Sequence, residues 1–127
     1  MARGSTWLAA TLALLPASAG AQDVATGATV FKTCAVCHSV KDQTRKVGPT
    51  LNGVVGRRAA TVEGYKYSGA MALASEGGLV WTEAEIATFI ADPRATIPGT
   101  TMAFVGLKKP EDVADVIAYI KQYSPAN

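Results

Sequence analysis

The pattern that most constrains this chain is Cys-x-x-Cys-His at residues 34–38, which contains the only two cysteines and the only histidine of the sequence. Two thiols three residues apart lie on one side of a helical turn, so both Cys34 and Cys37 can form thioether bonds with the vinyl groups on one edge of a porphyrin. His38 then lies under the ring centre, where it can bind the iron as the proximal ligand. The pattern therefore predicts one covalently attached c-type haem.

Three other interpretations of these residues are weaker. A structural zinc site needs four nitrogen or sulfur ligands, and the cysteines and the histidine supply only three. A thioredoxin-type redox pair lies at a strand-to-helix turn, and no alternating strand pattern precedes Cys34. A surface disulfide would leave the position of His38, directly after Cys37, without an explanation.

The charge balance argues against nucleic-acid binding. The 127 residues include 12 basic and 10 acidic side chains, and the isoelectric point is near 8.6. No basic motif with interleaved aromatic residues accompanies these charges. A chain of this length forms one domain at most.

Residues 1–21 have the pattern of a secretory signal peptide. Arg3 supplies a positive charge, residues 7–15 form an apolar run, and residues 19–21 form a small-x-small cleavage site. The run is about half as long as the roughly 20 apolar residues of a spanning helix. We therefore expect cleavage after Ala21 and a mature domain of residues 22–127, the alternative being an uncleaved anchor. Export to the periplasm agrees with the haem motif, since c-type haem is attached outside the cytoplasm.

The first and last helices of the mature chain carry clear signals. Asp23 can cap a helix leading to the cysteines, with Gly27 and Phe31 on one face that we expect to pack against another helix. Pro110 suits the first turn of the last helix, and Pro125 ends it. The apolar stripe of this last helix comprises Val113, Val116, Ile117 and Ile120.

Two shorter helices are expected between them. One spans Ser68–Ser75, and the other begins at a capping-box pattern of Thr82 and Glu85 and stops at Asp92-Pro93. No convincing alternating strand is present, so the predicted class is all-α, with short helices and long loops around one haem. Because a domain of about 100 residues has a marginal core, we expect the polypeptide without haem to be poorly folded.

The sixth iron ligand can be narrowed by elimination. His38 is already used, so a soft neutral ligand must be Met71 or Met102, the only methionines after Met1. Met71 lies in an expected helix, where a methionine usually fills the core, whereas Met102 follows the irregular segment 98–101, which could bend a thioether inward. The pattern favours Met102. The alternative is an ordinary core methionine, with the iron five-coordinate or bound by a lysine.

Further motifs recur along the whole mature chain. They are Gly27 with Phe31, Trp81, and the stretches at residues 34–38, 47–57, 65–68, 97–102 and 115–120. Together they resemble class I cytochrome c, most closely the bacterial relatives of mitochondrial cytochrome c, over residues 23–123. The resemblance implies the cytochrome c fold and heme c as the cofactor, and it too points to Met102.

The resemblance also implies roles around the haem. The carbonyl of Pro49 would accept the Nδ1 hydrogen of His38, which fixes the orientation of a ligating histidine. Tyr67 and Trp81 would donate to a haem propionate, and Arg57 would lie near the other polar edge. For Trp81 the alternative is simple core packing. One departure is Phe89, which stands where the family often has a tyrosine near the methionine sulfur.

Two classes of function follow from these residues. The first is a diffusible, monomeric periplasmic electron carrier, or such a carrier held in a larger oxidoreductase. The second is a haem enzyme or gas binder such as a peroxidase, which needs an open distal position and a polar acid/base group. No histidine beyond His38 is available for that role, and Met102 would block the iron. The sequence therefore favours the carrier over an enzyme.

The resemblance also implies redox partners. They would be a membrane ubiquinol-oxidising complex as donor, and a terminal oxidase or photosynthetic reaction centre as acceptor. A partner would dock over the exposed haem edge through a rim of basic residues, which is thinner here than in the mitochondrial form. The alternative is that these side chains only keep the surface solvated. The basic rim comprises Lys32, Lys46, Arg94, Lys108 and Lys109.

Overall fold

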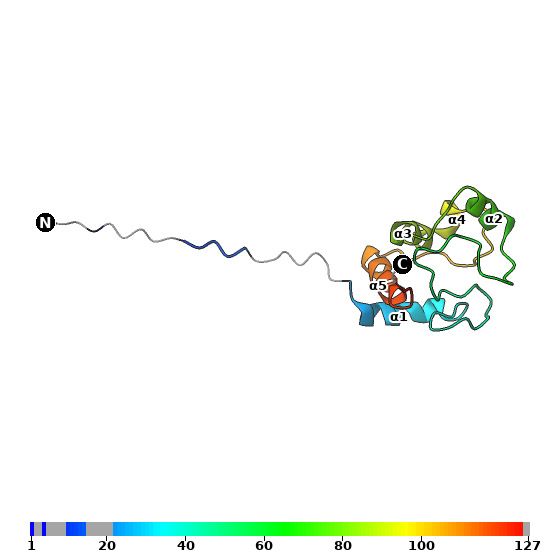
Figure 1. The fold of residues 1–127 in the computed structure, drawn as a ribbon, viewed down its shortest axis with the longest axis horizontal. Coiled ribbons are helices and arrows are strands. Elements are labelled where there is room, and N and C mark those ends of the chain that lie inside the picture. Colours follow the sequence, from blue (N-terminus) through cyan, green and yellow to red (C-terminus); the bar gives the residue numbers. More distant parts are fainter. Residues whose placement is uncertain (2–3, 5–9, 15–21, 126–127) are drawn as a thin grey trace.

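The computed structural model describes residues 1, 4, 10–14 and 22–125. Within these residues the chain forms five helices and no named strand, only an isolated bridge between Arg58 and Val80. The all-α prediction is therefore confirmed (Figure 1). Residues 15–21, with the predicted cleavage site, lie outside the described residues. The helices are α1 (Val24–Cys34), α2 (Gly69–Glu76), α3 (Glu83–Ala91), α4 (Pro93–Thr96) and α5 (Pro110–Lys121).

The first and last helices cross closely at Gly27. A Cβ atom at this position would overlap the backbone carbonyl of Asp115 in α5, so only glycine allows the approach. Phe31 is buried one turn later, and its ring centroid lies 5.2 Å from that of Tyr119. The carboxylate of Asp115 is also buried, and it accepts a hydrogen bond of 2.8 Å from the N–H of Asp23. The predicted packing of the Gly27 and Phe31 face against another helix is confirmed.

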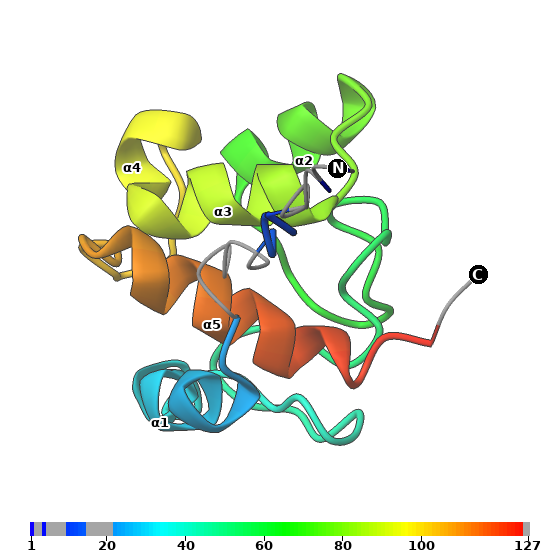
Figure 2. The ribbon, with the colours of Figure 1, turned by 90° about the vertical axis from the view of Figure 1, so that its left-hand side faces the viewer.

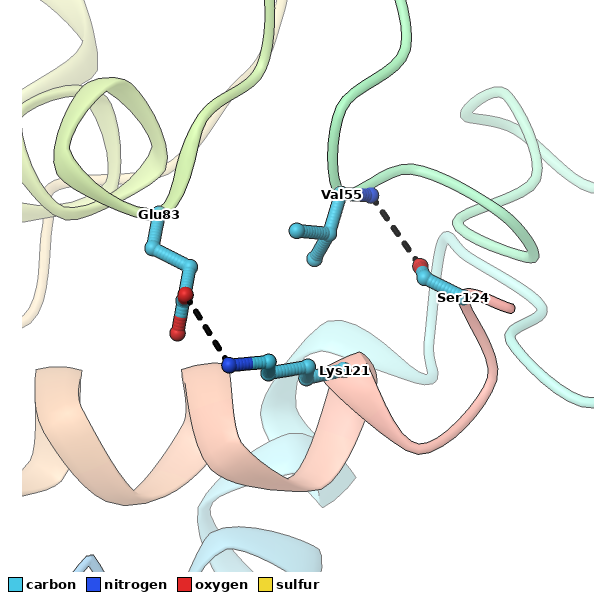
Figure 3. Close-up of polar contacts among 4 residues, drawn as sticks. All are labelled: Val55, Glu83, Lys121 and Ser124. Carbon is cyan, nitrogen blue, oxygen red and sulfur yellow. Dashed lines mark hydrogen bonds and ion pairs between the residues drawn. The ribbon is translucent and has the colours of Figure 1, made fainter. Parts of the chain in front are cut away.

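Helix α5 lies between α1 and α3, as Figure 2 shows. Its predicted apolar stripe is confirmed, because Val116, Ile117 and Ile120 are buried and Val113 is half-buried. An ion pair of 3.0 Å joins Lys121 in α5 to a carboxylate at the start of α3 (Figure 3). Both side chains are exposed, so this pair stabilises the fold by at most about 1 kcal/mol.

The chain beyond α5 fixes the loop that follows the cysteines. The N–H of Val55 donates to Ser124 Oγ over 3.1 Å (Figure 3), and the N–H of Gly53 donates to the carbonyl of Tyr123 over 2.9 Å. These bonds hold the loop beside the C-terminal end of α5. The loop that carries two predicted haem-pocket residues is thus anchored to a helix from the other end of the chain.

The helix starts agree with the sequence, with one correction. Asp23, Ser68 and Thr82 each accept a hydrogen bond from a backbone N–H three residues later. The predicted capping box is only half formed, because the N–H of Thr82 donates to the carbonyl of Val80 and not to the side chain of Glu85. The Val80 carbonyl belongs to the backbone, so this hydrogen bond does not require a side chain to become ordered.

The segment after α3 contains a helix that the sequence did not predict. The sequence predicts that helical structure stops at Asp92-Pro93, but α4 begins at Pro93. Asp92 caps it by accepting a hydrogen bond of 3.2 Å from the N–H of Ala95. Proline is tolerated in the first helical turn, where its missing N–H would have no partner. Asp92 therefore ends α3 as its C-cap and starts α4 as its N-cap.

The close crossing at Gly27 gives a test of the fold. Replacing Gly27 with Ala places a methyl group against the α5 backbone, so we expect a loss of about 1–3 kcal/mol in the free energy of unfolding. Gly69→Ala in α2 is the control, because a Cβ there meets no atom within 4 Å. Denaturant unfolding followed by circular dichroism measures both, and equal stability of the two variants would contradict the proposed close contact.

Candidate functional site

The C-terminal turn of α1 holds the cysteines and the histidine together. The carbonyl of Cys34 accepts hydrogen bonds from the N–H of Cys37, at 3.0 Å, and from the N–H of His38, at 2.9 Å. Both cysteine side chains are half-buried. Burial raises the pKa of the Cys34 thiol. One turn of backbone thus carries two thiols and an imidazole.

The hydrogen bond of His38 fixes its tautomer. Nδ1 of His38 lies 2.7 Å from the carbonyl oxygen of Pro49. A carbonyl can only accept, so Nδ1 carries the hydrogen and Nε2 keeps a lone pair. Burial lowers the pKa of His38, the Pro49 carbonyl opposes this, and the positive charges of Arg57 and Lys46 lower the pKa further. The ring is therefore neutral, as a metal-binding imidazole must be.

Gly48 leaves room for this imidazole. A Cβ at Gly48 would lie 2.5 Å from Cε1 of His38 and 2.8 Å from Nδ1. The N–H of Gly48 also donates to the carbonyl of Cys37 over 2.7 Å. Gly48 therefore lets the loop lie flat against the histidine ring. The sequence indicated only a turn here, because the contact depends on how the loop folds back.

Arg57 is a half-buried cation without a carboxylate partner among residues 22–125. Its guanidinium donates to two carbonyl oxygens, those of Thr50 at 2.9 Å and Asn52 at 3.1 Å. Burial lowers the pKa of Arg57, but the group is still charged at neutral pH. A buried charge is costly unless it is paired, so this position suits an anionic group.

A cavity of about 540 Å³ adjoins this guanidinium. It is lined by Pro49, Thr50, Arg57 and Tyr65 among others. The site thus combines an imidazole with a fixed lone pair, two thiols on one turn, and a cation. The open space adjoins the cation, and neither His38 nor the cysteines line it. These donors fit a c-type haem, whose iron takes the imidazole and whose propionates are anionic.

The hydroxyl of Tyr67 has a proton to donate. It accepts a hydrogen bond of 3.0 Å from the N–H of Val62, which uses an acceptor position only. Burial is the largest effect on Tyr67 and raises its pKa, although the Val62 hydrogen bond and Arg57 oppose it. Tyr67 is therefore protonated at neutral pH. A neutral phenol next to Arg57 is a suitable donor to a carboxylate.

Trp81 is buried, and its ring centroid lies 5.1 Å from that of Phe89. Its backbone N–H donates to the carbonyl of Arg57, and its carbonyl accepts from the N–H of Gly56, both at 2.8 Å. These contacts tie Trp81 to the segment that carries Arg57. They also agree with the simpler interpretation, in which the indole of Trp81 only packs in the core.

The two candidate methionines lie in different surroundings. Met71 is in the first turn of α2, and Met102 is in the irregular segment between α4 and α5. Both side chains are half-buried and pack against the core. The N–H of Met102 lies 3.3 Å from Thr100 Oγ1, and its carbonyl accepts from Phe104 over 3.0 Å. Local bonds thus shape the backbone on both sides of Met102.

Two lysines of the basic rim contact backbone carbonyls at helix ends. Nζ of Lys46 donates to the carbonyl of Ala35, just after α1, over 2.5 Å. Nζ of Lys108 lies 2.9 Å from the carbonyl of Val105 and 3.3 Å from that of Ala91, the last residue of α3. The sequence did not indicate these contacts, although a cation near a helix C-terminus is a general preference.

Known proteins with similar sequences and structures cover most of the chain. The family model described as Cytochrome c matches residues 24–124. The cytochrome c2 of Blastochloris viridis is 49% identical over 114 residues, which are 89% of this chain and 87% of that protein. Two solved structures are also similar, and in each comparison the alignment covers nearly all of the solved chain. No helix within the described residues is long and apolar enough to cross a membrane.

The first of these structures is cytochrome c2 from Rhodospirillum centenum, with a TM-score of 0.77, 38% identity and coverage of 81% of this chain and 99% of that one. The second is cytochrome cH from Methylobacterium extorquens, with a TM-score of 0.72, 40% identity and coverage of 79% and 98%. The similarity therefore extends from sequence to fold.

The contact of Gly48 with the imidazole gives a test of the site. Gly48→Ala would push His38 away from Pro49, so we expect a weakened axial bond and partial conversion of the oxidised protein to high spin. Val47→Ala is the control, because the Val47 side chain is 78% exposed. Visible absorption spectra of the two variants measure the spin state. An unchanged low-spin spectrum for Gly48→Ala would contradict the assignment of His38.

Proposed function

This chain belongs to the cytochrome c family, and from that premise we propose that it is a periplasmic electron carrier with one His/Met-ligated haem. Its cofactor is a single covalent c-type haem. The observation that carries the proposal is the hydrogen bond between His38 and Pro49, which leaves Nε2 free within the attachment motif. The predicted signal peptide of residues 1–21 supports export.

The protein's side chains hold and shield this group. The haem iron supplies a one-electron couple between its ferrous and ferric states. Cys34 and Cys37 would form the thioether bonds, and His38 would supply the nitrogen ligand in a fixed tautomer. Met102 would supply the sixth ligand, and a methionine sulfur would raise the reduction potential.

The polar edge of the haem is held by a second group of side chains. Arg57, Tyr67 and Trp81 would provide one cation and two neutral donors for the propionates. Pro49 acts through His38, because its carbonyl keeps the ring from rotating. A site held from several sides in this way changes little when one electron is added, which suits a carrier.

The carrier is favoured over a haem enzyme by what the site lacks for catalysis. A peroxidase needs an open distal position and a polar acid/base group, and the one histidine of the chain is already held by Pro49. Met102 as a sixth ligand closes the distal position. The partners we propose are a quinol-oxidising complex as donor and a terminal oxidase or photosynthetic reaction centre as acceptor. We propose that this protein binds each of them as a monomer.

The ligand assignment predicts different results for the two methionines. The oxidised wild-type protein should show the weak near-infrared sulfur-to-iron charge-transfer band. Met102→Ala should abolish the band, and Met71→Ala should keep it while losing about 2 kcal/mol of stability through lost packing. Near-infrared absorption and denaturant unfolding measure the two effects. The opposite pattern would move the ligand to Met71.

The same variants separate a carrier from a gas binder. The reduced wild-type protein should not bind carbon monoxide, because the sixth position is occupied, whereas reduced Met102→Ala should bind it. Uptake by the wild type at the same rate as by the variant would contradict the carrier proposal.

Docking through the basic rim predicts a dependence on salt. The rate of electron transfer to an acidic-faced partner should fall as ionic strength rises, because charges are screened over about 10 Å at 0.1 M. The effect should lie mainly in the association rate. Lys109→Glu should lower the low-salt rate by about threefold or more. Lys121→Glu, which makes the same change of net charge beside Glu83, is the control. A flat salt profile with no effect of Lys109→Glu would leave apolar contacts as the docking force.

A further inference from the structure

The C-terminal end of α3 binds the segment that carries Met102. The last carbonyls of any helix have no partner within the helix. Here the carbonyl of Ile90 accepts a hydrogen bond of 2.8 Å from the N–H of Leu107, and the carbonyl of Ala91 accepts from Nζ of Lys108 over 3.3 Å. Residues from beyond Met102 thus satisfy two carbonyls at this helix end.

Gly106 allows this close approach. Its φ is +106°, a conformation that favours glycine. A Cβ at Gly106 would overlap the carbonyl group of Ala91. The backbone of the segment therefore lies directly on the last turn of α3. The fit is built into the chain and does not depend on Lys108 alone.

Lys108 joins the two sides of this contact. Its ammonium lies 2.9 Å from the carbonyl of Val105, within the Met102 segment, and 3.3 Å from that of Ala91, on the helix. A cation near the negative end of a helix is also favoured by the helix dipole. Lys109 is also exposed, and within residues 22–125 its side chain makes no hydrogen bond. Two adjacent lysines therefore have different surroundings.

The other end of the segment is also fastened to α3. The hydroxyl of Thr96 lies 2.8 Å from the carbonyl of Asp92 and 3.1 Å from that of Thr88. A hydroxyl has one hydrogen, so this contact is shared between the two acceptors. The segment from Ile97 to Leu107 is thus a loop with both ends at the same helix terminus. Of these fastenings, only that of Lys108 involves a charge.

We propose that Lys108 is a positioning residue for the axial methionine, because its ammonium fastens the Met102 segment to the end of α3. This inference rests on the proposed function, in which Met102 binds the iron. Opening of the segment would withdraw the sulfur and expose the sixth position to an external ligand. Lys108 therefore sets how often the sixth position is open, in addition to any effect of its charge on docking.

Imidazole binding to the oxidised protein tests this role. The apparent affinity of a ligand is the intrinsic affinity multiplied by the fraction of protein in the competent state. Lys108→Met keeps an unbranched side chain as long as the apolar part of lysine and removes the ammonium. We expect its apparent imidazole affinity to rise about threefold to tenfold, the effect of one lost hydrogen bond. Lys109→Met is the matched control, and its affinity should stay within about twofold of wild type.

Amide hydrogen exchange in the same holoproteins gives an independent measurement. The N–H of Leu107, bonded to Ile90, should exchange about threefold to tenfold faster in Lys108→Met and at the wild-type rate in Lys109→Met. Equal imidazole affinities and equal exchange rates for the two variants would overturn the proposal. So would equal increases in both variants, since these would reflect only the loss of charge.

A failure of the proposed function looks different. If Met102 is not the ligand, Met102→Ala would bind imidazole no better than the wild type. The exchange of the Leu107 amide would still distinguish Lys108→Met from Lys109→Met if the lysine fastens the segment. The two ideas therefore fail separately.

Discussion

The close crossing of α1 and α5 at Gly27 determines where the parts of the site lie. Helix α1 ends in the turn that carries Cys34 and His38, so its placement on α5 places that turn. The C-terminal end of α5 holds the loop after the cysteines through Ser124, and that loop supplies the Pro49 carbonyl. One helix pair thus positions the histidine and the group that orients it. A loss of this crossing would affect both.

The ends of the helices, more than their faces, organise the loops around the site. The carbonyl of Ala35, after α1, accepts from Lys46, and the carbonyl of Ala91, at the end of α3, accepts from Lys108. Unsatisfied carbonyls at a helix C-terminus carry a partial negative charge. They therefore attract ammonium groups from neighbouring loops. A cation counted as a docking residue can in this way also hold a loop in place.

Features that depend on neighbouring residues were predictable from the sequence, and those that depend on distant ones were not. The cap at Asp23 and the stripe of α5 follow from local periodicity and end signals, and both are present. Helix α4 was missed because Pro93 was interpreted as a stop and not also as a start. The roles of Gly48 and Lys108 depend on contacts with His38 and Ala91, which sequence spacing alone does not reveal.

The distribution of buried residues explains why folding and cofactor should be coupled in this chain. Helix α2 has no buried residue, and only half-buried side chains such as Met71 and Ala74 pack from it against the core. Arg57 is half-buried with only carbonyl partners there, so its desolvation is offset by hydrogen bonds but by no opposite charge. Both features lie in the part of the chain between α1 and α3, where the loops are longest. An apolar ring with acidic groups would add buried surface near these loops and neutralise the guanidinium. The polypeptide alone has neither contribution, and a domain of about 100 residues has little stability to spare.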